Sequence, residues 1–209
     1  MLFRSVKCSS EAVGNKRDVR LVIGVGGEDT PIELLHRWSF EGGMDAERLA
    51  DTGTAASPAT AATVCGADAD TAVAFADGMV SLSGSGNSKG YLTLGTNTIP
   101  DTATLEFWAR EDAVRNWSRV FDYGVDTANY VMLSWTGGTD QRTDRFTAVN
   151  SQTSGNIDGS MAPYTPGTMY HISLALEKDA TDGSTMVRVM RRDAKTGELQ
   201  RMEIGRAHV

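Results

Sequence analysis

The sequence predicts an all-β chain whose strands pair antiparallel in a two-sheet sandwich or jelly roll. Short runs alternate apolar and polar residues, which is the period of a half-buried strand. Clusters of Gly, Asp, Asn, Ser and Thr separate these runs at intervals of about 8–12 residues, as turns between neighbouring strands do. Helical periodicity is nearly absent, so the pattern excludes a parallel α/β sheet, which needs helical crossovers.

The first half of the chain carries several short strand patterns. Residues 34–41 place His36, Trp38 and Phe40 on one side of an extended segment. Residues 51–69 contain small and polar residues with almost no bulky ones, which predicts a loop. Strands are expected at residues 18–25, 34–41, 72–76, 79–83 and 90–94.

The second half is more regular, apart from a polar loop expected around Gly155 and Pro163. Turns are expected at Asp182-Gly183 and at Lys195-Thr196-Gly197, and the second of these leads into a last strand. The other strands are expected at residues 104–110, 119–123, 129–135, 145–149, 169–177 and 185–191. The apolar phase of the runs predicts a core that includes Trp38, Phe40, Phe107, Phe121, Leu133, Ile172 and Leu174.

Composition limits the class of protein. The chain has 209 residues, 40% of them hydrophobic and 22% charged, which is typical of one folded domain and not of a disordered chain. No apolar stretch approaches the roughly 18 residues of a membrane-spanning helix. The net charge of −7 argues against a nucleic-acid-binding surface, which needs clustered Lys and Arg. Cys8 and Cys65 are too few for a disulfide scaffold.

Both ends of the chain resemble translated sequencing adapter. Residues 1–5 and 204–209 match the translations of two mutually complementary adapter strings, so we expect the natural coding sequence to cover residues 6–203. A signal for export would then precede the sequence given. On this interpretation residues 6–33 are the end of a preceding segment or linker.

Five segments taken together resemble bacterial laminin-G-like domains of the concanavalin A-like group. The segments are LLHRWSFEG at residues 34–42, AFADG at 74–78, GYLTL at 90–94, ATLEFWAR at 103–110 and PGTMYHI at 166–172. The resemblance implies a jelly roll of two antiparallel sheets over residues 34–203, similar in fold to lectins, pentraxins and some glucanases. It also implies that the family's closing C-terminal strands, with their acidic residues, are missing.

The acidic residues argue against an enzyme. Glucanases of this fold hold an acid pair on one strand with Glu-x-Asp-x-Glu spacing, so that alternate side chains enter one cleft. No such spacing occurs, because Glu106 stands alone in its strand and Glu111 is adjacent to Asp112. His36 and His171 lack a nucleophile motif, so we interpret both as structural or edge histidines.

Two groups of residues are candidates for a binding site. Trp117 and Trp135 flank polar turns, and the segment from Trp135 offers an aromatic face beside hydrogen-bonding groups, the combination that a sugar site needs. The ligand candidates are Trp135, Asp140, Gln141, Arg142 and Asp144; the alternative is a solvated hairpin loop. Asp45 and Asp51 lie in an acidic, Gly-bearing loop where oxygen ligands could meet Ca²⁺.

The sequence therefore favours a non-catalytic recognition module of a larger secreted or surface-attached bacterial protein, which binds glycan or an extracellular protein partner. A structural or adhesion spacer without a small ligand is the first alternative. A divergent glycoside hydrolase is the second, disfavoured by the absent acid pair.

Overall fold

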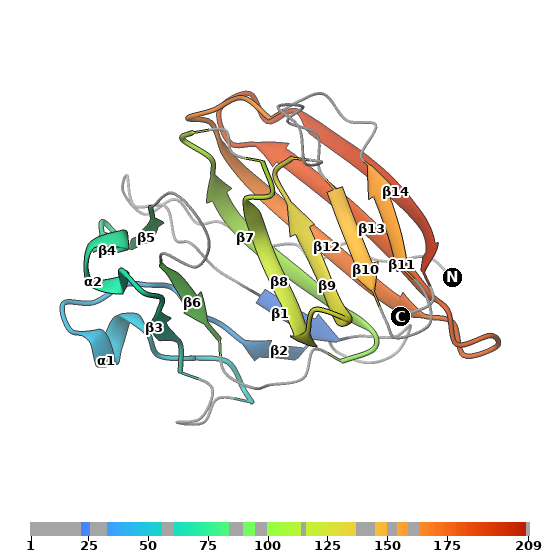
Figure 1. Cartoon of the computed structure of the whole chain (residues 1–209), viewed down its shortest axis with the longest axis horizontal. Coiled ribbons are helices and arrows are strands. Elements are labelled where there is room, and N and C mark those ends of the chain that lie inside the picture. Colours follow the sequence, from blue (N-terminus) through green and yellow to red (C-terminus); the bar gives the residue numbers. More distant parts are fainter. Residues whose placement is uncertain are drawn as a thin grey trace. The chain divides into compact units, whose positions relative to one another are not determined.

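The computed structural model describes residues 22–25, 33–55, 61–83, 90–94, 100–113, 116–136, 145–149, 154–158 and 164–207. The chain divides into two compact units, residues 1–105 and 106–209. Antiparallel strands dominate both units, and each of the two described helices is a single turn of four residues (Figure 1). The all-β, antiparallel part of the fold prediction is confirmed, whereas the jelly-roll arrangement stays a prediction.

Unit 1 contains three strand pairs and both helices. Strand β1 (Val22–Val25) pairs with β2 (Glu33–His36), β3 (Thr63–Cys65) with β6 (Tyr91–Thr93), and β4 (Val73–Ala76) with β5 (Met79–Leu82). Helix α1 spans Asp45–Arg48, and helix α2 spans Ala69–Ala72. Asp77 and Gly78 connect β4 to β5 with φ angles of 53° and 69°, the backbone that a two-residue type I′ hairpin requires.

Among the described residues, unit 2 contains four neighbouring strands of a six-stranded sheet and one complete four-stranded sheet. The strands of the first follow the order β14-β13-β12-β7, with β7 (Ala103–Arg110) crossing the boundary between the units, β12 (Met169–Lys178), β13 (Thr185–Asp193) and β14 (Leu199–Ala207). The second has the order β11-β10-β9-β8, with β8 (Arg119–Asp126), β9 (Asn129–Ser134), β10 (Arg145–Val149) and β11 (Ser154–Asp158).

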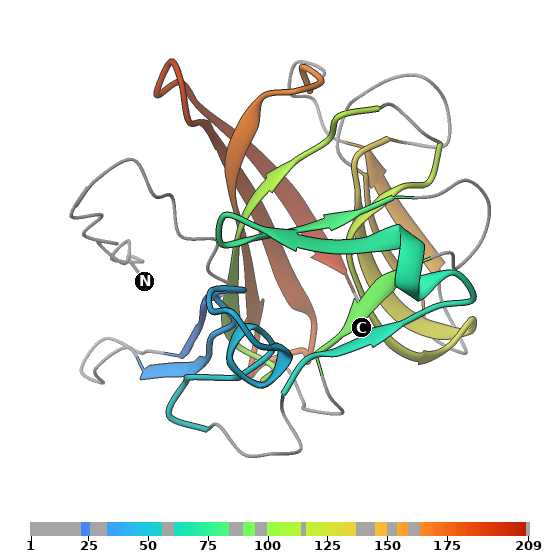
Figure 2. The ribbon, with the colours of Figure 1, turned by 90° about the vertical axis from the view of Figure 1, so that its left-hand side faces the viewer.

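The two sheets of unit 2 lie face to face and enclose its core (Figures 1 and 2). Phe107 of β7 and Phe121 of β8 make one contact between the sheets, with ring centroids 5.9 Å apart. Alternate residues of β13 are buried up to Arg191, as the period-2 pattern predicts, whereas β12 buries Tyr170 and the consecutive residues Ile172, Ser173 and Leu174. Among the residues whose burial is described, the buried apolar ones of unit 2 are Val131, Met132, Leu133, Trp135, Phe146, Ala148, Tyr164, Tyr170, Ile172, Leu174, Val187 and Val189.

Four of the seven predicted core residues are buried, and three are not fully buried. Trp38, Leu133, Ile172 and Leu174 are each 2% exposed or less. Phe40, Phe107 and Phe121 are only partly buried. The prediction for Phe40 assumed that the strand beginning near residue 34 continued to residue 41, but β2 ends at His36 and Phe40 has a φ of +57°.

Two segments predicted as loops contain strands. Residues 63–65 form β3 within the segment predicted as a loop at 51–69, and residues 154–158 form β11 within the predicted polar loop. Neither segment has strong apolar alternation; each is a strand because its backbone pairs with a neighbour, β6 or β10. Strand β14 continues to Ala207, so it includes residues 204–207, whose adapter origin stays a prediction.

Candidate functional site

Three strand ends meet at one end of the second sheet of unit 2. Arg119 at the start of β8 and Arg145 at the start of β10 both lie opposite Ser134 at the end of β9. Because neighbouring strands are antiparallel, the segment before β8 and the segment between β9 and β10 leave the sheet on the same side. We call the described residues here, 116–119, 134–136 and 145, the loop end, and Trp135 is the predicted ligand residue among them.

Trp117 is the exposed aromatic residue of the loop end. Its side chain is 48% exposed, and its backbone has a φ of +65°. This left-handed conformation is a genuine outlier for a bulky residue and costs on the order of 1–3 kcal/mol. The Trp117 N–H donates to Oγ1 of Thr136 at 3.1 Å, and Thr136 is fully buried. A buried hydroxyl therefore holds the backbone that presents the indole.

Arg145 lies against the Trp117 indole. Its guanidinium carbon is 5.3 Å from the ring centroid, within the range of a cation–π interaction. Arg145 is the first residue of β10 and follows residues 137–144 in the sequence. The planar guanidinium restricts the orientation of the Trp117 ring. The side chain therefore loses less conformational entropy when a ligand binds.

Ser134 joins the two ends of the segment between β9 and β10. Its buried hydroxyl lies 2.8 Å from the carbonyl oxygen of Thr136 and 3.3 Å from that of Arg145. Its single hydrogen is shared between these two acceptors. The two stems of the segment are therefore fixed relative to each other by the sheet.

Trp135 lies in the core beneath the loop end. It is 7% exposed, and its ring packs edge-on against Tyr164 at 4.8 Å between centroids. Tyr164 packs in turn against Tyr170 at 4.9 Å, and the guanidinium of buried Arg191 lies 4.0 Å from the Tyr164 ring. Of the predicted ligand residues, Trp135 is the one in a described range, and its ring is buried in this aromatic cluster. Asp140, Gln141, Arg142 and Asp144 lie outside the described residues, and their role stays a prediction.

Glu111 places a buried carboxyl group next to the residue that follows Trp117. The Ser118 hydroxyl, one residue after Trp117, donates to the Glu111 Oε1 at 3.1 Å. Glu111 itself is 7% exposed, and its carbonyl accepts the N–H of Gly167 at 2.8 Å. The segment before β8 is therefore tied to the segment before β12.

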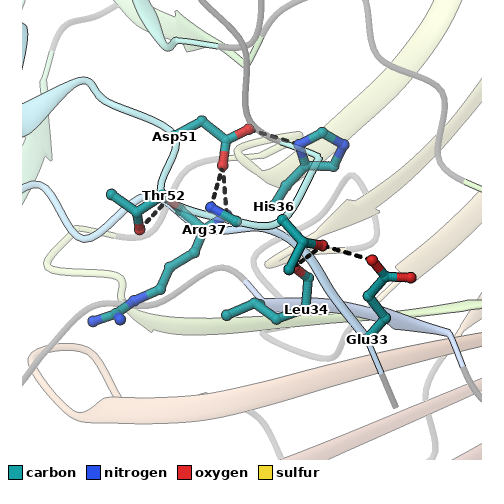
Figure 3. Close-up of polar contacts among 8 residues, drawn as sticks. Glu33, Leu34, His36, Arg37, Asp51 and Thr52 are labelled. Atoms are coloured by element: carbon teal, nitrogen blue, oxygen red, sulfur yellow. Dashed lines mark hydrogen bonds and ion pairs between the residues drawn. The ribbon is translucent and has the colours of Figure 1, made fainter. Parts of the chain in front are cut away.

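The residues predicted as calcium ligands have different surroundings in unit 1. Asp45 is exposed in α1, where its Oδ1 lies 3.4 Å from Nε of Arg48. The Asp51 side chain is fully buried and makes three contacts, which Figure 3 shows in part. Its Oδ2 lies 2.6 Å from Nδ1 of His36, and its Oδ1 accepts the N–H groups of Arg37 and Gly53.

These contacts make Asp51 a structural residue that holds a loop against β2. Within the described ranges, no group of three or more His, Cys, Asp and Glu side chains is arranged to hold a metal ion. Among the described residues, no group of further calcium ligands therefore surrounds Asp45 or Asp51, and the calcium site stays a prediction.

Glu106 of β7 and His171 of β12 form a second polar pair in unit 2. Their Oε2 and Nε2 atoms are 3.7 Å apart, and the His171 ring lies 4.9 Å from that of Trp108. The sequence contains no second acid at glucanase spacing beside Glu106. His36 and His171 both have carboxylate neighbours, which fits their interpretation as structural histidines.

Sequence reasoning singled out Trp117 because it flanks a polar turn, but it did not find the pairing with Arg145. The signal for that pairing is weak, since 28 positions separate the two residues and only the register of β8, β9 and β10 brings them together.

No protein-family model, curated protein or solved structure matches this chain. In the part of the chain that the structure describes, no helix has the length and apolar character needed to cross a membrane.

Proposed function

We propose that this chain is a non-catalytic, glycan-binding recognition module, built on a laminin-G-like jelly roll and belonging to a larger secreted or surface-attached bacterial protein. The two antiparallel sheets of unit 2 support the jelly-roll part of this proposal. Its ligand site is the loop end of unit 2.

The observation that carries the proposal is the exposed indole of Trp117. It stands beside Arg145, at the end of a segment rich in Asp, Gln, Arg and Thr. An aromatic face beside hydrogen-bonding side chains suits a sugar. The C–H groups of the sugar pack on the π-system of the indole, while the sugar's hydroxyls form hydrogen bonds to the polar side chains. Strained backbone at an exposed residue is more frequent at functional sites than elsewhere.

A glycan array probed with the full chain tests the proposal. We expect binding to a defined set of glycans, and we expect the variant Trp117→Ala to lose most of that binding. A wild-type chain that binds no glycan on the array would contradict the proposal. Release of reducing sugar from soluble β-glucans would contradict its non-catalytic part.

A further inference from the structure

We propose that the ligand of the Trp117 platform, defined as Trp117 with Arg145, is an acidic glycan whose carboxylate or sulfate group pairs with the guanidinium of Arg145. The inference rests on the proposed function and specifies the chemical class of its ligand. It follows from three features of the described residues: the cation against the indole, the exposure of both side chains, and the partners of the acidic side chains nearby in the sequence.

The first feature is the positive charge that lies against the indole. The guanidinium carbon of Arg145 is 5.3 Å from the centroid of the Trp117 ring. A cation at this distance is attracted by the negative π-face and repels the weakly positive C–H groups that a neutral sugar would place on the same ring. An anionic group beside the ring is instead attracted to the cation. The charge at the platform therefore favours an acidic sugar over its neutral counterpart.

The second feature is that a ligand can reach both side chains. Trp117 is 48% exposed, and Arg145 is partly exposed. A guanidinium has five N–H donors, so Arg145 can donate to an oxyanion in addition to the interactions that it makes within the chain. Carboxylates and sulfates offer two or more acceptor oxygens to the fork of donors on a guanidinium. The exposed part of the indole then packs on the sugar ring that carries the anionic group.

The third feature is that two acidic side chains close to Trp117 in the sequence are engaged by other groups. Glu111 is buried and accepts the Ser118 hydroxyl, and the Asp112 Oδ1 lies 2.6 Å from Nε of Arg110. The net charge of −7 belongs to the whole chain, and charges more than about 8 Å apart are largely screened at physiological ionic strength. A ligand on the indole therefore meets the positive charge of Arg145 at short range, although the chain as a whole is acidic.

Isothermal titration calorimetry of the full chain tests this inference. The ligands are oligogalacturonates, alginate oligomers and sulfated carrageenan oligomers, each compared with its neutral form made by carboxyl reduction or desulfation. We expect at least one acidic oligosaccharide to bind about tenfold or more tightly than its neutral form. The uronate and sulfate arms show which anionic group the platform accepts. Raising the NaCl concentration from about 50 to about 500 mM should weaken binding of the acidic form, because salt screens the ion pair.

Variants of the platform separate direct contact with the ligand from the effect of net charge. Arg145→Gln removes the cation and should raise the dissociation constant of the acidic ligand by roughly tenfold or more, whereas Arg145→Lys keeps the charge and should raise it less. Trp117→Gly removes the ring at a φ that Gly accepts, and it should weaken binding of both the acidic and the neutral form. The matched control is Arg188→Gln, which removes the same charge from β13 in the other sheet and should change the constant less than about twofold.

The ratio of the neutral to the acidic dissociation constant is the readout that a folding defect does not imitate. A smaller folded fraction raises both constants by the same factor and leaves their ratio unchanged. Arg145→Gln should bring this ratio close to one, whereas Arg188→Gln should leave it as in the wild-type chain.

The remaining outcomes distinguish this inference from the proposed function. If none of the acidic oligosaccharides binds more tightly than its neutral form, the inference is overturned, and glycans that bind on the array leave the proposed function standing. An acidic preference that persists in Arg145→Gln, or that Arg188→Gln reduces equally, has the same meaning. If no glycan binds in the calorimeter or on the array, the proposed function and this inference both fail.

Discussion

Asp51 connects three neighbours in unit 1 through one buried carboxylate. It lies 2.6 Å from the imidazole of His36 and accepts the N–H groups of Arg37 and Gly53. These bonds explain why β2 ends at His36, because the next backbone N–H is taken by a side chain instead of a strand. The Asp51 carboxylate therefore contributes to ending β2 at His36.

Replacing Asp51 by Ala should destabilise the protein by about 2–4 kcal/mol, since buried donors lose their acceptor and His36 loses its partner. Urea denaturation measures this change. The control is Asp45→Asn, which alters an exposed ion pair and should change the free energy of unfolding by less than about 0.5 kcal/mol. Equal effects of the two variants would show that Asp51 is not structural.

Gly53 occupies a position with no room for a side chain. A Cβ placed there would lie 2.1 Å from the carbonyl oxygen of Leu35. We expect Gly53→Ala to cost about 1–3 kcal/mol, because backbone atoms must move to accept the methyl group. Gly43→Ala is the control, since a Cβ at Gly43 meets nothing within 4 Å. Thermal unfolding of both variants compares them, and similar midpoints would contradict the prediction.

At the scale of the elements, side chains at the tips of the hairpins stabilise the turns. In the turn between β13 and β14, the Asp193 Oδ1 accepts the N–H of Lys195 at 2.7 Å and that of Thr196 at 2.9 Å. The hydrogen bond from Thr196, followed by that from Lys195, holds the pKa of Asp193 below its ordinary value. The ionised carboxylate thus favours the folded turn.

This lowered pKa predicts how stability depends on pH. The contribution of Asp193 is present above the pKa of the unfolded chain, about 3.9, and is lost as the pH falls through the lower pKa of the folded chain. We expect the wild-type chain to be more stable than Asp193→Asn at pH 7, with the difference shrinking below about pH 4. Denaturation of both proteins from pH 7 to pH 2 measures it. A difference that stays constant over this range would contradict the prediction.

The elements also show what the sequence could predict. Strands β10, β12 and β13 lie within two residues of their predicted bounds, because their alternating residues face a core on one side. Strand β11 was missed because its five residues, SGNID, gain their order from pairing with β10 and not from an apolar pattern. Phe40 was misplaced because β2 ends at His36, where Asp51 accepts the N–H of Arg37, and because Phe40 itself has a left-handed φ of +57°.

The candidate site was predictable to a smaller extent. The segment after Trp135 has a suitable composition, but composition does not reveal that the Trp135 ring is buried while the Trp117 ring is exposed. That distinction depends on a left-handed backbone at Trp117 and on a bond to Thr136, which are tertiary properties.

At the scale of the whole molecule, the elements differ in the number of neighbours that hold them. Strands β12 and β13 have a partner strand on each side, and each contains residues that are fully buried. Strands β4 and β5 form a two-stranded sheet with no fully buried residue in either strand. Stability is therefore expected to be distributed unevenly along the chain.

Hydrogen exchange of the full chain should reveal this distribution. We expect paired amides of β12 and β13 to exchange about 100-fold more slowly, or slower still, than paired amides of β4 and β5. Mass spectrometry of peptides from a time course measures the rates. Similar protection of both pairs of strands would show that the chain opens only as one cooperative unit.

The unequal exposure of the four tryptophans gives the protein its own optical labels. Trp38 and Trp135 are buried and Trp108 is partly buried, whereas nearly half of the Trp117 side chain is open to solvent. Acrylamide in solution will therefore quench the fluorescence of Trp117 before that of the others. Any molecule that covers this indole will protect it from the quencher, so occupancy of the loop end can be followed on the unmodified chain without attaching a dye.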